Sequence, residues 1–166
     1  MGGRITNLGL ISVSLLLVIT LTAPSLGQTN STDLNASQWF GVGLSLFNQN
    51  RFEESNQAFD KATDIYPQFA EAWNFKGIDL GSMGKYEDSR QALERAVAIN
   101  SSYAQAWYNL GVVCDSLGDY NSAVRAYNMA TEINPNNQDA WFRKNQDIDI
   151  IGIGHTSLYN ELTGRT

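Results

Sequence analysis

The sequence has little of the side-chain chemistry on which most enzymes and metalloproteins depend. Its 166 residues include one cysteine, one histidine and three prolines. A single cysteine excludes a disulfide framework within the chain. One histidine and one cysteine are also too few for a zinc site, which takes about four ligands. We therefore predict no disulfide, no metal site and no cofactor.

Catalytic motifs are missing as well. The chain has no G-x-x-x-x-G-K-[ST] loop, no H-E-x-x-H and no G-x-S-x-G. The carboxylates of Asp147 and Asp149 are expected at the surface, without a pocket that would raise the pKa of either. Cys114 falls at an apolar helical position and is predicted to be a small buried hydrophobe, not a catalytic thiol. We therefore predict that the chain is not an enzyme.

Positive charge is scarce. Lys and Arg number 11 against 17 Asp and Glu, which gives a net charge of −6, and the first 50 residues hold one basic residue, Arg4. No run of Lys or Arg occurs anywhere in the chain. Nucleic-acid binding needs a basic patch, so we expect none.

A repeat with a period of 34 residues dominates the chain. All four tryptophans fall at one phase of the period: Trp39, Trp73, Trp107 and Trp141. Glycine recurs four residues after the tryptophan at Gly43, Gly77 and Gly111. Two blocks of apolar residues at helical spacing in each unit predict two amphipathic helices. The expected helices span residues 37–49, 52–66, 70–83, 86–100, 104–117 and 120–134, with Asn50, Gly84 and Gly118 as left-handed residues between the helices of each pair.

These columns resemble the tetratricopeptide repeat family, whose signature is W-x2-L-G-x2-Y, then A-x3-F, then P. The third copy, AWYNLGVVCDSLGDYNSAVRAYNMATEINPNN, matches best, whereas Lys76, Ser55, Ser89 and Ser101 depart from the pattern in the earlier copies. The resemblance implies an all-α solenoid of helical hairpins in a right-handed superhelix. Its repeats are expected at residues 36–69, 70–103 and 104–137, with a capping helix at 138–150.

The resemblance also implies that the first helices of the hairpins line a concave face, where a peptide or a helix of a partner protein docks. The residues expected to contact that partner are Phe40, Asn74, Phe75, Tyr108, Asn109 and Arg143. Leu44, Ile78 and Val112 are expected on the same face. Packing between neighbouring helices is the alternative role for these three residues and for Phe40, Phe75 and Tyr108.

Some family members bind a C-terminal carboxylate through a clamp of Lys, Asn and Arg. Asn109 and Arg143 match two columns of that clamp, but Asn74, Ile78 and Asp139 occupy other columns. A carboxylate needs concentrated positive charge to offset its desolvation, so clamp-type binding is not expected.

The N-terminus reads as a secretory signal over residues 1–27, with a charge-free stretch at 8–23. An uncleaved membrane anchor formed by residues 8–23 is the alternative. Both alternatives place the repeats outside the cytoplasmic membrane. A polar spacer is expected at 28–35, and N-x-[ST] triplets begin at Asn30, Asn35 and Asn100, about as many as chance gives.

After the capping helix, residues 151–166 are expected to form an irregular tail, because Gly152 and Gly154 should break a helix. The tail and the end of the cap are rich in isoleucine: Ile148, Ile150, Ile151 and Ile153. This segment could fold back on the last repeat, pair with a partner or continue the cap helix irregularly. Homotypic assembly through it is the alternative to partner binding in the groove.

Overall fold

The computed structural model describes residues 34–163. The predicted signal peptide or anchor lies outside the described residues, as do Asn30 and all but the last two residues of the spacer. Within the described part, the chain forms seven helices and no strand. The predicted all-α fold is confirmed.

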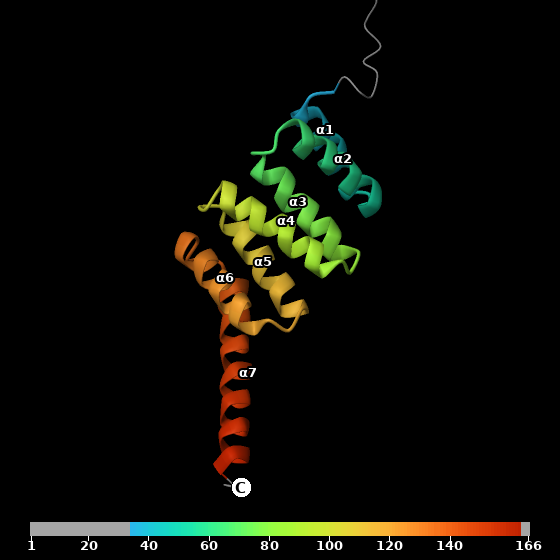
Figure 1. The fold of residues 1–166 in the computed structure, drawn as a ribbon. Coiled ribbons are helices and arrows are strands. Elements are labelled where there is room, and N and C mark those ends of the chain that lie inside the picture. The colour runs from blue at the N-terminus through green and yellow to red at the C-terminus, as the bar shows by residue number, and fades with distance from the viewer. Residues whose placement is uncertain (1–33, 164–166) are drawn as a thin grey trace, which may run out of the picture.

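The helices pair in sequence order as hairpins that stack on one another (Figure 1). They are α1 (Ala36–Phe47), α2 (Phe52–Ile65), α3 (Ala70–Ser82), α4 (Tyr86–Ile99), α5 (Ala104–Ser116), α6 (Tyr120–Ile133) and α7 (Gln138–Thr163). The first six agree with the predicted boundaries to within two residues at each end. Helices α1 and α2, α3 and α4, and α5 and α6 form the three hairpins, and α7 packs on α6.

Each hairpin turns at the left-handed residue that the sequence predicts. Asn50, Gly84 and Gly118 have φ angles of 58°, 74° and 75°. Glycine adopts this conformation without a steric penalty, and asparagine tolerates it better than most residues.

The two helices of a hairpin approach most closely at the glycine column. A Cβ added to Gly43 would lie 2.4 Å from the Phe59 ring, and one added to Gly77 would lie 2.5 Å from Cγ of Leu93. The close approach also explains two departures from the family pattern. The buried Ser55 and Ser89 hydroxyls donate hydrogen bonds to the carbonyls of Gly43 at 2.9 Å and Gly77 at 2.6 Å.

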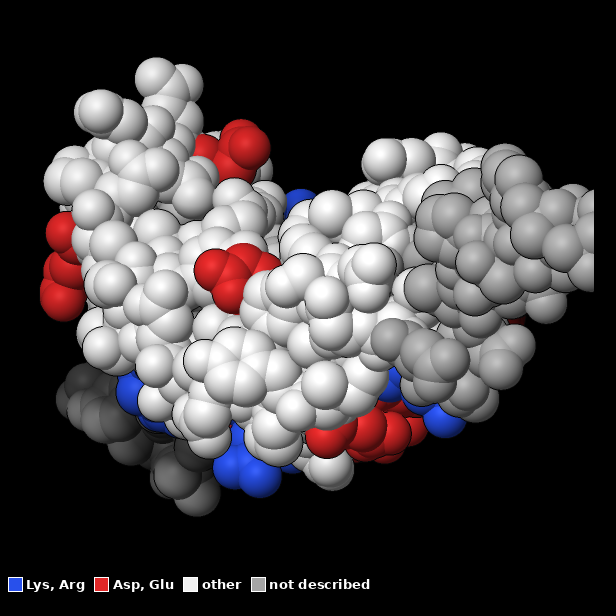
Figure 2. All heavy atoms as spheres, turned by 90° about the horizontal axis from the view of Figure 1, so that it is seen from above, with Lys and Arg blue, Asp and Glu red and all other residues white. Residues whose placement is uncertain are grey.

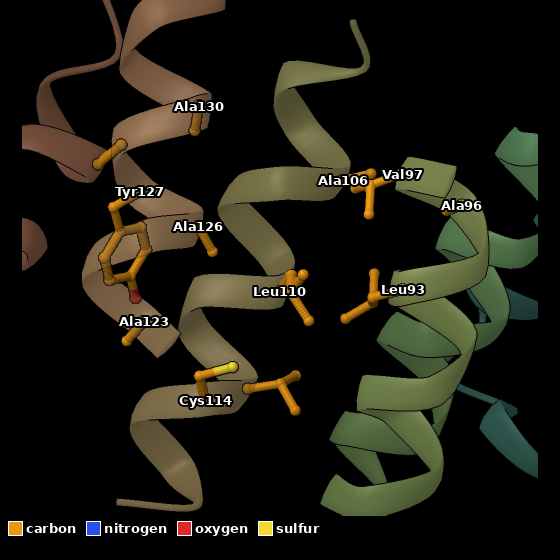
Figure 3. Packing of buried hydrophobic residues seen from close by; sticks show 12 residues of the cluster. Leu93, Ala96, Val97, Ala106, Leu110, Cys114, Ala123, Ala126, Tyr127 and Ala130 are labelled. Atoms are coloured by element: carbon orange, nitrogen blue, oxygen red, sulfur yellow. The ribbon is translucent and has the colours of Figure 1, made fainter. Parts of the chain in front are cut away.

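The core of the stack consists of small residues around a few large ones. One buried cluster joins α4, α5, α6 and α7, and Figure 3 shows how Leu93 of α4, Leu110 of α5 and Tyr127 of α6 contribute to it. Cys114 belongs to this cluster and is 2% exposed, as predicted. Burial raises the pKa of its thiol to about 11.

The predicted end of the capping helix at residue 150 is wrong. Helix α7 has 26 residues and runs through both Gly152 and Gly154, so the tail is helical as far as Thr163. A glycine inside a helix costs only about 1 kcal/mol relative to alanine, and the segment contains no proline. Figure 1 shows the C-terminal half of α7 extending beyond the stacked hairpins.

Candidate functional site

A pocket of about 310 Å³ lies between α3 and α5. Residues of both helices line it: Ile78, Gly81, Ser82, Asn109, Val112 and Ser116. Leu93 and Tyr86 of α4 also contribute to its lining. The structure thus brings equivalent columns of the second and third repeats together around one hollow, which we call the α3–α5 pocket.

Gly81 lines the pocket without contributing a side chain to it. The equivalent position of the first repeat, eight residues after the tryptophan, holds Phe47, and that of the third repeat holds Asp115. A Cβ added to Gly81 would lie 3.3 Å from Oγ of Ser89 and 3.8 Å from the Val113 side chain. A side chain at position 81 would therefore contact Ser89 and Val113, and Val113 also lines the pocket.

The polar groups at the edge of the pocket have partners inside the protein. The hydroxyls of Ser82 and Ser116 donate to the carbonyls of Ile78 and Val112, one turn earlier, at 2.9 and 3.0 Å. No charged side chain lines the pocket. These features suit an aliphatic or aromatic side chain of a ligand better than a charged group.

Asn74 is buried, which corrects its predicted role as an exposed contact. It is 1% exposed, it donates to the Tyr103 hydroxyl at 3.4 Å, and its Oδ1 accepts from Nδ2 of Asn109 at 2.9 Å. Oδ1 of Asn109 accepts in turn from Gln105 at 3.1 Å. The two asparagines therefore join α3 to α5 beside the pocket, and only Asn109 lines it.

Phe40 and Phe75 lie together at the N-terminal end of the groove. Both are half-buried, with ring centroids 5.7 Å apart, and the Phe40 ring lies 4.8 Å from that of Phe69. The Phe75 ring also contacts Phe47 at 5.5 Å. These aromatics pack α1 against α3. Part of each Phe40 and Phe75 ring therefore serves the packing between neighbouring helices that was the alternative to partner contact.

Tyr108 and Arg143 lie at the other end, next to a carboxylate that the sequence analysis left out of the site. The Tyr127 hydroxyl donates to Oδ2 of Asp115 at 2.6 Å, and Nη1 of Arg143 lies 3.6 Å from the same oxygen. The Tyr108 ring packs on that of Tyr127, with centroids 5.9 Å apart. The charge of Arg143 is therefore already offset by Asp115.

Asp147 corrects a second expectation, because it is not a surface carboxylate. It is 3% exposed, and its Oδ2 has no hydrogen-bond partner. Burial, together with the neighbouring Asp115, raises the pKa of Asp147. The repeat pattern indicates this burial. Asp147 and the buried Asp79 both follow a tryptophan by six residues, so they occupy the same position of the repeat.

A larger hollow of about 770 Å³ lies among α2, α3 and α4, but its lining is a poorer recognition surface. It holds side chains of both signs, including Asp60, Asp88 and Arg95. Lys76 lies in it, 2.6 Å from Asp60 and over the Trp73 ring. Mixed charges of this kind are typical of a solvated face.

In Figure 2, Lys and Arg gather along the lower edge, whereas most of the face in view is uncharged and hollowed at its upper edge.

Among the residues whose side chains the structure describes, no group of three or more His, Cys, Asp or Glu could hold a metal ion. Among the helices of this described part, none is long and apolar enough to cross a membrane.

Comparisons with known proteins agree with the repeat pattern. Models described as tetratricopeptide repeat match residues 37–69 and 104–137, and a model described as TPR repeat matches residues 80–114. No curated protein sequence matches the chain.

Several solved structures share the fold. A crystal structure of MamA is 25% identical with a TM-score of 0.69, over 70% of this chain and 68% of that one. The first TPR of Spaghetti (RPAP3), bound to the HSP90 peptide SRMEEVD, is 21% identical with a TM-score of 0.69, over 70% of this chain and 93% of that one. The Sgt2 TPR domain from Aspergillus fumigatus is 17% identical with a TM-score of 0.68, over 73% and 82% of the two chains.

Proposed function

Because the chain belongs to the tetratricopeptide repeat family, we propose that it is a non-enzymatic module that binds a peptide or helix of a partner protein in its concave groove. The observation that carries this proposal is the α3–α5 pocket, whose lining is free of charged side chains. An apolar side chain of the partner enters this pocket and anchors the bound segment. Phe40 and Phe75 on one side, with Tyr108 on the other, extend the contact surface along the groove.

The ligand differs in chemistry from the acidic peptide held by the Spaghetti (RPAP3) structure. Ile78 and Asp139 occupy columns where a carboxylate clamp needs basic residues, and the Arg143 charge is offset by Asp115. A free carboxylate would lose its hydration here without gaining concentrated positive charge. We therefore assign the groove to an apolar segment without a required terminal carboxylate.

The proposed place of action is outside the cytoplasmic membrane. The support is the sequence of residues 1–27, which has the composition of an export signal, with residues 8–23 as an anchor if the signal is retained. Partners would then be exported or surface proteins.

Site-specific photo-crosslinking in cells tests the groove. The full chain would carry a photoreactive amino acid at Ser82, at the edge of the pocket, or at the exposed Lys61 of α2 as the matched control. We expect an adduct with a discrete partner protein from position 82 and none from position 61. A second substitution, Gly81→Leu, places a large side chain at a lining position of the pocket and is expected to remove the adduct from position 82.

Three results would contradict the proposal. They are the same adducts from both positions, an adduct at position 82 that persists in the Gly81→Leu chain, and an adduct containing only a second copy of the chain. A thermal melt of Gly81→Leu, compared with that of the parent, controls for loss of the fold.

A further inference from the structure

Two carboxyl groups from different helices meet where α7 packs on the third hairpin. Asp147 of α7 is 3% exposed, and its carboxyl group lies within hydrogen-bonding reach of Asp115 of α5. No donor from another residue reaches Oδ1 of Asp115 or Oδ2 of Asp147, and both oxygens are buried. A carboxylate only accepts hydrogen bonds, so a bond between the two groups needs a proton on one of them.

The neighbours of this carboxyl pair decide which member is ionised. Asp115 accepts a hydrogen bond from the Tyr127 hydroxyl at 2.6 Å and lies 3.6 Å from Nη1 of Arg143. Both interactions favour its ionised form. Burial, together with the neighbouring Asp115, raises the pKa of Asp147, against a smaller opposing effect of Arg143. Asp147 is therefore the neutral member, and its hydroxyl donates to the Asp115 carboxylate.

A second negative charge at this place would have no counterpart. Among the side chains that the structure describes, the titratable groups that face Asp147 are Asp115 on α5, Tyr127 on α6 and Arg143 on α7 itself. Burial and Asp115 raise the pKa of the Tyr127 hydroxyl, so it stays protonated. The one positive charge, that of Arg143, is already offset by Asp115. Ionised Asp147 would thus lie against another carboxylate in a site that excludes water.

We propose that the proton shared by Asp147 and Asp115 latches α7 onto the third hairpin, and that loss of this proton as the pH rises loosens the helix. The docked helix favours the neutral acid, whereas an undocked Asp147 would ionise near the ordinary pKa of about 4. Docking therefore weakens by up to about tenfold per pH unit between that value and the raised pKa, and stays weak above it. Helix α7 is the last helix of the described part and packs chiefly on α6, so it can open without unfolding the hairpins.

Opening of α7 changes the C-terminal end of the groove. Arg143 belongs to α7, whereas Tyr108 belongs to α5, so these two predicted contact residues separate when the helix leaves. The latch makes this end of the groove complete at acidic pH and incomplete at higher pH. The inference needs no bound partner, so it stands or falls independently of the groove proposal.

Hydrogen exchange of the full chain at pH 5 and pH 7.5, followed by mass spectrometry, tests the latch. Protection is taken relative to the intrinsic exchange rate at each pH. Asp147→Asn keeps a donor toward Asp115 but cannot ionise, and Asp149→Asn removes an exposed carboxylate from the same helix as the matched control. Between pH 5 and pH 7.5, we expect the protection of residues 138–150 in the parent to fall at least about tenfold relative to Asp147→Asn. Asp149→Asn should behave as the parent does.

The same pH dependence in the parent and in Asp147→Asn would overturn the proposal, and so would an Asp149→Asn chain that behaves like Asp147→Asn. Asp79 is present in all three chains, so its titration cancels in the comparison. A titration of the Asp147 carboxyl carbon by NMR in the parent gives a reading that needs no variant. A midpoint well above 4 is expected there, and an ordinary midpoint near 4 would rule the latch out.

Discussion

The ring of Tyr127 occupies the space that a side chain on Gly111 would need. A Cβ added to Gly111 would lie 2.4 Å from Cε1 of Tyr127, which is fully buried. The hydrogen bond from the Tyr127 hydroxyl to Asp115 holds the ring in place. We expect Gly111→Leu to lower the free energy of unfolding by about 1 to 3 kcal/mol, as measured by urea denaturation followed by circular dichroism.

Gly41→Ala is the matched control for this prediction. A Cβ at Gly41 would meet nothing within 4 Å, so alanine should stabilise α1 by about 0.5 to 1 kcal/mol through its better helix propensity. A Gly111→Leu chain that unfolds at the urea midpoint of the parent would show that the packing of α5 on α6 is misassigned.

The hydroxyl of Tyr127 is itself expected to stabilise the C-terminal part of the stack. It donates to Asp115 at 2.6 Å, inside a cluster that also holds Arg143 and the buried Asp147. Tyr127→Phe keeps the ring and removes the donor, so a partly buried carboxylate loses a hydrogen bond. We expect a loss of about 1 to 3 kcal/mol in the free energy of unfolding.

Tyr66→Phe serves as the control for Tyr127→Phe, because Tyr66 is 52% exposed. Removal of its hydroxyl should change the free energy of unfolding by less than about 0.5 kcal/mol. Equal small effects of the two substitutions would mean that the bond between Tyr127 and Asp115 contributes nothing net to stability.

The sequence predicted the hairpins because their determinants are local and repeat three times. The glycine column, the left-handed turn residues and the tryptophan column each mark one place in the unit. In the loop before the third tryptophan, Ser101 replaces the proline of the family pattern without changing the fold. The Trp107 indole donates to the carbonyl of Ser101 at 2.9 Å, as Trp73 does to that of Pro67, and a backbone carbonyl is present whichever residue stands there.

Features that depend on two repeats at once were predicted less well. The burial of Asn74 depends on Asn109 and Tyr103 of the next repeat. The burial of Asp147 depends on how α7 packs near Asp115. The α3–α5 pocket is lined by residues of two repeats, among them Gly81, whose lack of a side chain is informative only beside Phe47 and Asp115 at the same column. The predicted end of α7 at residue 150 rests on Gly152 and Gly154, but a glycine only weakens a helix, and the segment has no proline to break it.

Cys114 provides a direct reporter of unfolding. It is the one cysteine of the chain, it is 2% exposed, and burial raises the pKa of its thiol to about 11. Because the thiolate is the reactive form, we expect a thiol reagent at pH 8 to leave the native chain unmodified and to label it fully in urea. Labelling should rise with the same urea midpoint as the loss of circular dichroism. Rapid labelling of the native chain would contradict the burial of α5 against its neighbours.

Asp79 should make stability depend on pH in the direction opposite to an ion-paired carboxylate. It is 0% exposed, and neither of its oxygens has a hydrogen-bond partner. Burial raises the pKa of Asp79 from 3.8 to about 6, against a smaller opposing effect of the nearby Ser55 hydroxyl. The folded state therefore favours the neutral acid, and ionisation costs stability as the pH rises from about 4 to 6.

Asp79→Asn removes this cost without changing the size of the side chain. We expect the variant to exceed the parent in free energy of unfolding by about 1 to 3 kcal/mol more at pH 7.5 than at pH 4.5, as measured by urea denaturation at both pH values. Asp147 is present in both chains, so its own titration cancels in the difference. Asp79→Val, which copies the equivalent Val113 of the third repeat, should show the same pH trend. A difference that stays constant between the two pH values would mean that Asp79 is solvated and ionised as an ordinary surface carboxylate.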